Sequence, residues 1–325
     1  MKCNRRMFLS GLFASFLASR RGLAQEGASA EPKLFTRSPS DYDPNLVVLF
    51  SDTHCSPTKS HDQSRNLRSF IAEVLRLNPL PAQAVLFGDF AYHFGLPEDY
   101  RYAAQLVKPL TDAGVKLTIG MGNHDRREEF LEVFPDFAKS TKVPGRIVSI
   151  VETPHADLIL LDSLQQGVDK NKWITPGELN EEQRAWLTET LRAYRKPVFV
   201  GAHHPVQELK IEKLLFDSPM AAGYIHGHNH QWKRLWMEQG WKYKRVFRTL
   251  GLPSTSHWGD IGYSLFRLSP QAATVTLRQI DFYYPKPVPT QERPADWDVH
   301  VAENNGQTCT FQLPQRAAVA ASSEF

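Results

Sequence analysis

The sequence predicts an α/β fold built around a parallel sheet that is buried on both faces. In the first half of the chain, strand and helix patterns alternate, beginning with the apolar run at Asn45. The strand segments are apolar at nearly every position, which is typical of parallel strands that are buried on both faces. Polar residues follow directly after the strands, which indicates a site at one edge of this sheet.

The first half contains five elements in the order that such a sheet requires. Each strand is a short apolar run, and each helix repeats apolar residues at intervals of three and four. The expected elements are a strand from Asn45, a helix over Ser64–Leu77, a strand from Ala84, a helix over Tyr100–Ala113 and a strand from Lys116. Gly114 follows the second helix, where glycine commonly ends a helix in a left-handed conformation.

The second half is less regular. An antiparallel pair of strands is expected at residues 146–152 and 157–163, followed by an amphipathic helix whose N-terminus is capped by Asn180. Two more strands start at Pro197 and Ala222 and run into polar loops. The last strands are expected at Lys244–Leu250, Tyr263–Leu268 and Ala273–Asp281.

The first 30 residues have the pattern of an export signal. A basic start is followed by a short apolar run, Met7–Ala18, and by small residues that fit cleavage after Ala24 or Ala30. Residues 5–9, Arg-Arg-Met-Phe-Leu, resemble the twin-arginine export signal. This resemblance implies the twin-arginine translocase as a partner and a periplasmic or extracellular location. The alternative is an uncleaved membrane anchor or a basic tail.

The organisation that follows is a signal over 1–30, a linker over 31–44, one catalytic domain over 45–283 and a Pro-rich C-terminal extension over 284–325. The composition of the extension predicts that it packs loosely or not at all. A disulfide between Cys55 and Cys309 is permitted in an oxidising compartment. The sequence does not determine the oligomeric state.

Composition excludes several classes of protein. A hydrophobic content of 42% and a charged content of 22% are those of a globular chain, not of a disordered one or a coiled coil. Five basic residues and no acidic ones lie before the first cleavage point, and without them the 38 Lys and Arg fall below the 35 Asp and Glu. The mature chain therefore gives no indication that it binds a nucleic-acid polymer.

Short polar motifs follow five of the expected strands. Because strand carboxyl ends meet at one edge of an open α/β sheet, these motifs would lie together. One such motif is commonly a turn, but five in order predict a functional site. The motifs are Asp52-Thr53-His54, Gly88-Asp89, Gly122-Asn123-His124-Asp125, His203-His204-Pro205 and Gly227-His228-Asn229-His230.

The residue types predict a site for two metal ions that acts on a small phosphoester. Carboxylate and amide oxygens with imidazole nitrogens suit manganese, iron or zinc, as divalent or trivalent ions. One carboxylate can bridge two metals, and a hydroxide between them is a nucleophile at neutral pH. The positive charge of the cluster would attract an anionic substrate.

The ordered motifs resemble those of the calcineurin-like metallophosphoesterases, over roughly residues 46–260. The resemblance implies a layered α/β/β/α sandwich of two mixed β-sheets flanked by helices. It also implies two sets of metal ligands that share Asp89. One set is Asp52, His54, Asp89 and His230, and the other is Asp89, Asn123, His203 and His228.

Within that family, the Gly-Asn-His-Asp-Arg phrase at 122–126 and the His-His-Pro and Gly-Leu-Pro-Ser-Thr-Ser phrases at 203–205 and 251–256 resemble class III cyclic-nucleotide phosphodiesterases. In the implied reaction, a metal-bridging hydroxide attacks phosphorus and His124 assists the leaving group, which suits an imidazole. The Gly-Asp-x-Val-Asp-Arg-Gly phrase of calcineurin-type protein phosphatases is absent, since Phe90 follows Asp89.

Other residues keep two interpretations. Arg126, His204 and His257 are candidate substrate contacts; a charge-balancing role for Arg126 and a supporting role for His204 are the alternatives. Asp125 is expected to position His124 or to cap a helix.

Of the three histidines 226, 228 and 230, the last two are expected to bind metals and His226 is not. Residues two apart on an extended segment share a face and are about 7 Å apart, so the two later histidines approach different metals. His226, at the end of the strand, is then a supporting residue.

Three hypotheses for function follow. The first is an exported two-metal phosphodiesterase, and the second is a phosphomonoesterase or nucleotidase of the same fold. The third, from another class, is a non-catalytic metal-binding or phosphate-binding module. All the expected ligands are present, which favours an enzyme.

Overall fold

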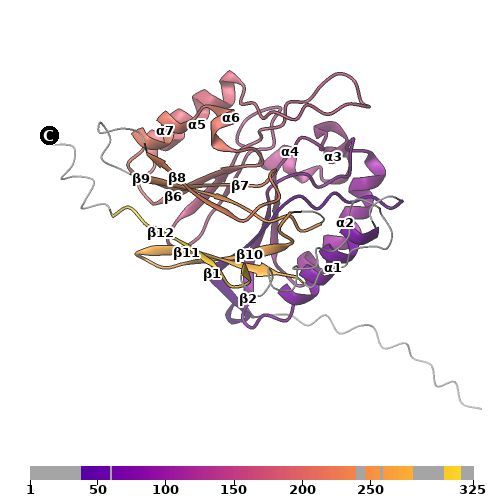
Figure 1. Cartoon of the computed structure of the whole chain (residues 1–325), viewed down its shortest axis with the longest axis horizontal. Coiled ribbons are helices and arrows are strands. Elements are labelled where there is room, and N and C mark those ends of the chain that lie inside the picture. Colours follow the sequence, from indigo (N-terminus) through magenta and orange to yellow (C-terminus); the bar gives the residue numbers. More distant parts are fainter. Residues whose placement is uncertain (1–37, 59–60, 239–245, 257–258, 281–303, 316–325) are drawn as a thin grey trace, which may run out of the picture. The chain divides into compact units, whose positions relative to one another are not determined.

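A computed structural model describes residues 38–58, 61–238, 246–256, 259–280 and 304–315. The expected signal and residues 31–37 of the expected linker lie outside this part of the chain. Within it, two six-stranded sheets are flanked by helices (Figure 1). None of the helices in these ranges has both the length and the apolar character needed to cross a membrane.

The first sheet begins with three parallel strands joined by helices. β1 (Tyr42–Phe50), β2 (Leu80–Leu86) and β3 (Lys116–Ile119) lie side by side, and α1 (His61–Val74) and α2 (Pro97–Asp112) form the connections. The predicted alternation of strand and helix is confirmed. Gly114 follows α2 with a φ of +85°, as expected for a glycine that ends a helix.

Antiparallel strands complete the first sheet on the other side of β1. β10 (Gly262–Leu268) pairs with β1, β11 (Ala272–Gln279) with β10, and β12 (Thr308–Gln312) with β11. β12 lies in the 284–325 extension, for which composition predicts loose packing. For β12 this prediction is wrong, because Cys309 and Phe311 alternate along the strand and are buried.

The second sheet has the strand order β4-β5-β6-β7-β9-β8. Its four inner strands are parallel, and the edge strands β4 and β8 are antiparallel to their neighbours. The predicted antiparallel pair, β4 with β5, is confirmed, whereas β8 is an addition to the prediction. The strands are β4 (Ser149–Val151), β5 (Asp157–Leu160), β6 (Val198–Ala202), β7 (Ala221–His226), β8 (Lys233–Glu238) and β9 (Val246–Gly251).

Helices cover the outer face of each sheet (Figure 1). α3 (Arg127–Val133) and α4 (Asp136–Ser140) join α1 and α2 on the first sheet. α5 (Glu181–Ala193), α6 (Val206–Leu209) and α7 (Glu212–Asp217) cover the second sheet. The predicted cap of α5 is present, since the Asn180 side chain accepts a hydrogen bond of 3.2 Å from the Gln183 backbone N–H.

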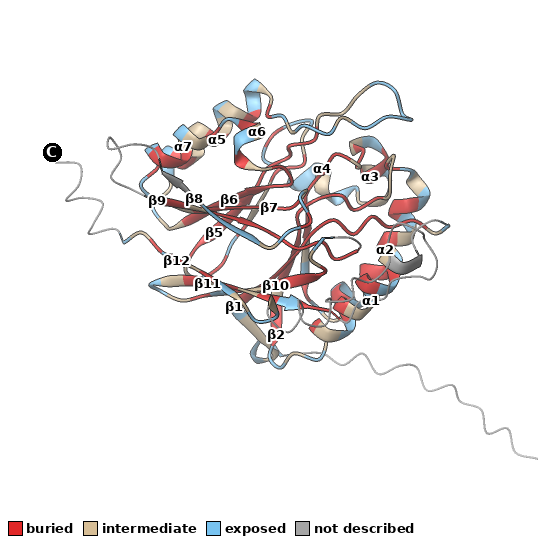
Figure 2. Ribbon diagram, viewed as in Figure 1, coloured by how far each residue is buried: buried red, intermediate tan, exposed pale blue. Residues whose placement is uncertain are grey.

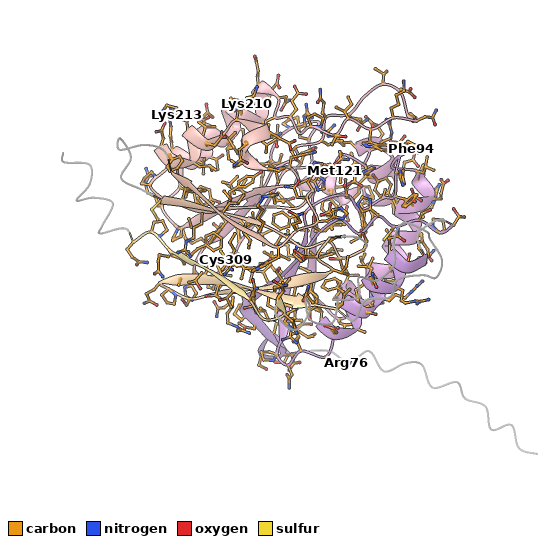
Figure 3. The ribbon with its side chains drawn as sticks, viewed as in Figure 1. Arg76, Phe94, Met121, Lys210, Lys213 and Cys309 are labelled. Carbon is orange, nitrogen blue, oxygen red and sulfur yellow. The ribbon has the colours of Figure 1, made fainter. Side chains whose placement is uncertain are left out.

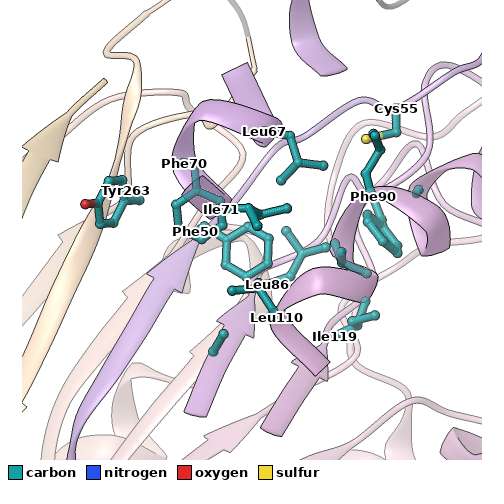
Figure 4. Packing of buried hydrophobic residues seen from close by; sticks show 14 of the residues in the cluster. Phe50, Cys55, Leu67, Phe70, Ile71, Leu86, Phe90, Leu110, Ile119 and Tyr263 are labelled. Carbon is teal, nitrogen blue, oxygen red and sulfur yellow. The ribbon is translucent and has the colours of Figure 1, made fainter. Parts of the chain in front are cut away.

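Alternate residues of the central strands face two different cores. Val48 and Phe50 of β1 belong to the core under α1 and α2, whereas Val47 and Leu49 face the second sheet. Figure 4 shows Phe50 in the first of these cores. Figure 2 shows the buried residues concentrated along the strands of both sheets. The order of layers is helix, sheet, sheet, helix, and the expected α/β/β/α sandwich is therefore present.

Cys55 and Cys309 are both free and buried. Cys55 belongs to the core under α1 and α2 (Figure 4), and Cys309 lies on β12 in the core between the sheets (Figure 3). The disulfide that an oxidising compartment would permit is not formed.

Candidate metal centre

The expected ligands follow the carboxyl ends of strands from both sheets. Each sheet contributes parallel strands, so the residues after them collect at one edge of the sandwich. Asp52 and His54 follow β1, Asp89 follows β2, Asn123 follows β3, His203 follows β6, and His228 and His230 follow β7. The structure brings all seven together.

Most of these residues have a backbone conformation that is rare outside glycine. The φ angles are +55° at Asp52, +43° at His54, +51° at Asp89, +68° at His228 and +53° at His230. Each such conformation costs about 1–3 kcal/mol and persists only where the surrounding structure fixes it. Such strain is concentrated at functional sites, and here it is concentrated on the expected ligands.

Glycines in the same motifs allow the turns to pack closely. A Cβ atom at Gly122 would collide with the Asp89 carboxylate, and one at Gly227 would collide with the Ser51 hydroxyl. Gly88, just before Asp89, has a φ of +99°. The turns after β1, β2, β3 and β7 are therefore fitted to one another at this edge.

One group of donors is formed by Asp52, His54 and His230. His230 Nε2 lies 3.2 Å from Asp52 Oδ1 and 3.4 Å from His54 Nε2. Asp89 Oδ2 lies 3.7 Å from His54 Nε2, which brings this carboxylate to the edge of the group. All four residues are buried.

A second group is formed by Asp89, Asn123, His203 and His228. His203 Nε2 lies 3.2 Å from Asp89 Oδ2 and 3.1 Å from Asn123 Oδ1. His228 Nδ1 lies 2.9 Å from Asn123 Oδ1 and 3.2 Å from His203 Nε2. The same oxygen of Asp89 therefore faces both groups, as expected for a bridging carboxylate.

These donor sets fit metal ions. Asp52 Oδ1 is buried and lies 3.2 Å from the ring nitrogen His230 Nε2. The two groups consist of ring nitrogens, carboxylate oxygens and one amide oxygen. Neither group, as defined here, contains a lysine or arginine that could neutralise its carboxylates. Each of the triads Asp52-His54-His230 and Asp52-Asp89-His203 has its ligand atoms within 4.8 Å of one another. Such oxygen and imidazole donors suit Mn, Fe or Zn.

Backbone carbonyls orient two of the histidines. The second ring nitrogen of His203, Nδ1, lies 2.9 Å from the Phe87 carbonyl, and Nδ1 of His54 lies 3.3 Å from the Tyr92 carbonyl. A carbonyl accepts a hydrogen bond and so fixes the proton on Nδ1. Nε2 is then the nitrogen that faces the cluster, which is the usual arrangement of a histidine that binds a metal.

The electrostatics of the cluster differ from one histidine to the next. Burial opposes protonation of His203, but the Asp89 and Asp52 carboxylates outweigh it and raise the pKa of His203 to about 9. Burial lowers the pKa of His54 to about 3. Burial, aided by the nearby His203, lowers the pKa of His228 to about 4. Of these three histidines, His203 is therefore the one that carries a positive charge in the metal-free protein.

His124 lies at the partly exposed side of the cluster. Its backbone N–H donates to Asp89 Oδ1 at 2.8 Å, and its Nδ1 lies 3.0 Å from the His93 carbonyl. Its ring centroid is 5.0 Å from that of His54. The predicted acid–base residue is thus next to the donor groups, and the carbonyl of His93 leaves Nε2 to face a substrate.

The candidate substrate contacts have different positions. The buried Arg126 donates to carbonyl oxygens of Asp169, Gly167 and Lys172 and so holds the loop that contains them. His204 is buried beside the second group with both ring nitrogens engaged, Nδ1 with Ser163 Oγ at 2.8 Å and Nε2 with the Thr175 carbonyl at 2.9 Å. This supports the alternative, supporting role. His257 lies outside the described residues.

Asp125 has a role that neither sequence interpretation included. Its carboxylate accepts hydrogen bonds from the backbone N–H groups of Gly122, Phe90 and Ala91 and from the Tyr100 hydroxyl. It therefore joins the turn that carries Asp89 to the turn that carries Asn123. Neither positioning of the His124 ring nor helix capping is among these contacts.

His226 is buried at the end of β7, and its Nδ1 lies 2.9 Å from the Gly227 carbonyl. This position agrees with a supporting residue of the strand.

Sequence patterns did not indicate that a loop borders the cluster. Trp173 of this loop packs against His124, with ring centroids 4.8 Å apart. One feature of the sequence could have indicated this loop. Trp173 lies in a largely polar segment, Gly167–Thr175, that has neither a strand nor a helix pattern.

Known proteins with similar sequence or structure agree with this geometry. The chain is 27% identical over 164 residues to a probable cyclic nucleotide phosphodiesterase of Rhodopseudomonas palustris, which covers 49% of this chain and 56% of that protein. The match thus spans little more than half the relative's length. The fold is similar to that of a dimetal phosphatase from Danio rerio, with a TM-score of 0.58 and 14% identity over 74% of this chain and 98% of that one.

The family assignment follows from a broader match. The sequence pattern of the calcineurin-like phosphoesterases matches residues 46–232, which include all seven converging donors and more than half of the chain. The chain therefore belongs to the calcineurin-like phosphoesterase family.

Proposed function

We propose that this protein is an exported phosphodiesterase whose two metal ions are held by the donor groups that share Asp89. The observation that carries the proposal is the approach of Asp89 Oδ2 to both His203 Nε2, at 3.2 Å, and His54 Nε2, at 3.7 Å. Asp52, His54 and His230 would hold one ion, and Asn123, His203 and His228 the other. When bound, two such ions activate a water molecule and neutralise charge on phosphoryl oxygens.

His124 would supply the proton that the leaving group requires. Its Nδ1 donates to the His93 carbonyl, and this hydrogen bond directs Nε2 away from the backbone. In the protonated form, Nε2 donates its proton to the departing ester oxygen, and the ring becomes neutral. A positioned acid of this kind contributes about 10²–10⁴-fold to a rate.

The preference for a diester rests on similarity. The relative from Rhodopseudomonas palustris is named a probable cyclic nucleotide phosphodiesterase, and its match includes 49% of this chain. The phrases at 122–126 and 203–205 support the same substrate class. The alternative is a phosphomonoesterase or nucleotidase, and the experiment must distinguish it from a phosphodiesterase.

The test compares a phosphodiester with the matching monoester. The metal-free protein is reconstituted separately with Mn²⁺, Fe²⁺ and Zn²⁺ and assayed with bis(4-nitrophenyl) phosphate and 4-nitrophenyl phosphate. We expect a higher kcat/KM for the diester with at least one metal. A strong preference for the monoester would reject the phosphodiesterase assignment, and hydrolysis of neither by any metal-loaded form would favour a non-catalytic binding module.

Export is a separate part of the proposal. The pair Arg5 and Arg6 precedes Met-Phe-Leu in the expected signal. We expect that replacing both by lysine (Arg5→Lys with Arg6→Lys) keeps the precursor in the cytoplasm of a bacterium that has the twin-arginine translocase. Fractionation and immunoblotting measure this, and unchanged export of the double variant would reject the route.

A further inference from the structure

The loop over residues 164–177, which joins β5 to α5, is fixed to the body of the protein by side chains. Arg126 Nη2 donates to the Asp169 carbonyl at 2.7 Å, and the backbone N–H of Arg127 donates to Gln166 Oε1 at 3.0 Å. At the other end of the loop, the Gly177 N–H donates to Glu208 Oε2 at 2.8 Å. The loop therefore has a defined position beside the cluster.

Trp173 is the residue of this loop that reaches the cluster. Its ring centroid is 4.8 Å from that of His124, 5.3 Å from His93 and 5.5 Å from Phe94. Despite these contacts, 40% of Trp173 is exposed. A tryptophan that packs on a candidate catalytic histidine and is itself partly exposed is placed to contact a substrate that approaches that histidine.

The burial of the donors shows from which side a substrate arrives. Asp52, Asp89 and His203 are buried, whereas His124 and His228 are partly exposed. The half-open hollow that Trp173, Phe94 and His124 line together with residues of the 164–177 loop has room for about 10 Å³, which is about one water molecule. A substrate group that approaches His124 from the side of the 164–177 loop therefore contacts the exposed part of Trp173.

We propose that Trp173 determines substrate specificity by stacking on a planar aromatic group of the ester arm that departs toward His124. This inference rests on the proposed phosphodiesterase function and narrows its substrate class to diesters that carry a nucleobase or another flat ring. Indole favours flat partners because offset stacking matches the charge distributions of two rings. An aliphatic arm gains only apolar contact.

The experiment uses two matched pairs of substrates with the metal-loaded full chain. Adenosine 2′,3′-cyclic phosphate is paired with glycerol 1,2-cyclic phosphate, and bis(4-nitrophenyl) phosphate with glycerophosphoglycerol. In Trp173→Ala, kcat/KM for the planar member of each pair falls roughly 10- to 100-fold, the range of single base–aromatic stacking. The aliphatic member changes by no more than roughly threefold, the scatter of a surface substitution. Trp173→Phe recovers part of the loss.

The matched control is Val168→Ala, because Val168 is fully exposed on the same loop. This variant retains both activities. Equal losses for the planar and aliphatic members in Trp173→Ala would overturn the inference, since they would indicate that Trp173 only holds His124 in place. A wild-type enzyme that cleaves the aliphatic member of each pair as well as the planar one would also overturn it. Failure of the wild type to hydrolyse any diester would instead reject the proposed function itself.

Discussion

The buried floor of the cluster and its exposed mouth are built in different ways. The floor consists of Asp52, Asp89 and His203, which follow strand ends and are fixed by turns and neighbouring carbonyls. The mouth consists of His124 and Trp173, and Trp173 lies on a loop whose contacts come from distant side chains. The floor contains donors for the proposed metal ions, and the mouth contains the two residues that we propose to contact the substrate.

This difference separates two kinds of substitution. A change on the floor should alter metal binding and therefore every activity. A change at the mouth should leave the metals in place and alter the rate or the choice of substrate.

The largest effect is expected for Asp89→Ala, because this carboxylate faces both donor groups. We expect fewer than two equivalents of bound metal and a loss of activity above about 10³-fold. This loss is larger than the loss caused by removing a single hydrogen-bond donor at a reacting group. Elemental analysis and turnover measure both quantities. Two tightly bound equivalents in this variant would contradict a shared position.

His124→Ala tests the mouth residue that lies next to the buried donors. We expect both metals to remain bound while kcat falls about 10²–10⁴-fold, since the variant loses only a proton donor. His155→Ala is the matched control, because His155 precedes β5, at the opposite end of that strand from the cluster. Loss of metal in His124→Ala would show that His124 contributes to metal binding, and it would then belong to the floor.

Asp125→Ala tests whether the floor depends on the link between two turns. The carboxylate of Asp125 accepts from Phe90, Ala91 and Gly122, so its loss should loosen Asp89 and Asn123 together. Metal affinity should fall about 10–100-fold, as when a supporting contact of a ligand is removed. Competition with a chelator measures the affinity, and the surface variant Asp112→Ala should leave it unchanged.

The smallest effect is the number of protons released when metal binds, because His203 and His228 start from different protonation states. With a pKa of about 9, His203 is protonated at pH 7.5 in the metal-free protein, whereas His228, with a pKa of about 4, is neutral. A metal requires the unprotonated ring, so binding should release the proton of His203 at pH 7.5. Release should decline as pH rises through 9, and affinity should rise over the same range.

Calorimetric titration of the metal into the metal-free protein, in two buffers with different ionisation enthalpies, measures this proton. The same release at pH 10 as at pH 7.5 would exclude His203 as its source.

The strand ends, their ligands and the cap of α5 were predictable because each depends on a few neighbouring residues. Asn180 caps α5 through a contact only three residues away, and the motif glycines permit the turns that aim the ligands. β12 was missed because the Pro-rich residues before it dominate the composition of that segment, although Cys309 and Phe311 follow the alternation of a strand. β8 was missed because its Lys233, Arg234 and Glu238 are typical of an edge strand and weaken the apolar signal.

The roles of Arg126 and Asp125 could not be predicted, because their partners are distant in the chain. Arg126 is bound to carbonyls some forty residues away, and a carbonyl acceptor has no sequence signature. Proximity in the Gly-Asn-His-Asp-Arg phrase suggested a substrate contact, whereas the fold turns this side chain toward the 164–177 loop. Such contacts become visible only when the packing of the loop is known.

The position of β1 has a consequence for the order of folding. β1 is central in its sheet, and Leu46 pairs with Arg267 while Val48 pairs with Ala84. During synthesis, its partner β2 emerges soon after it, but β10 emerges only when most of the chain has been made. Such long-range pairing slows folding, and until it forms, one hydrogen-bonding edge of β1 is open to other chains.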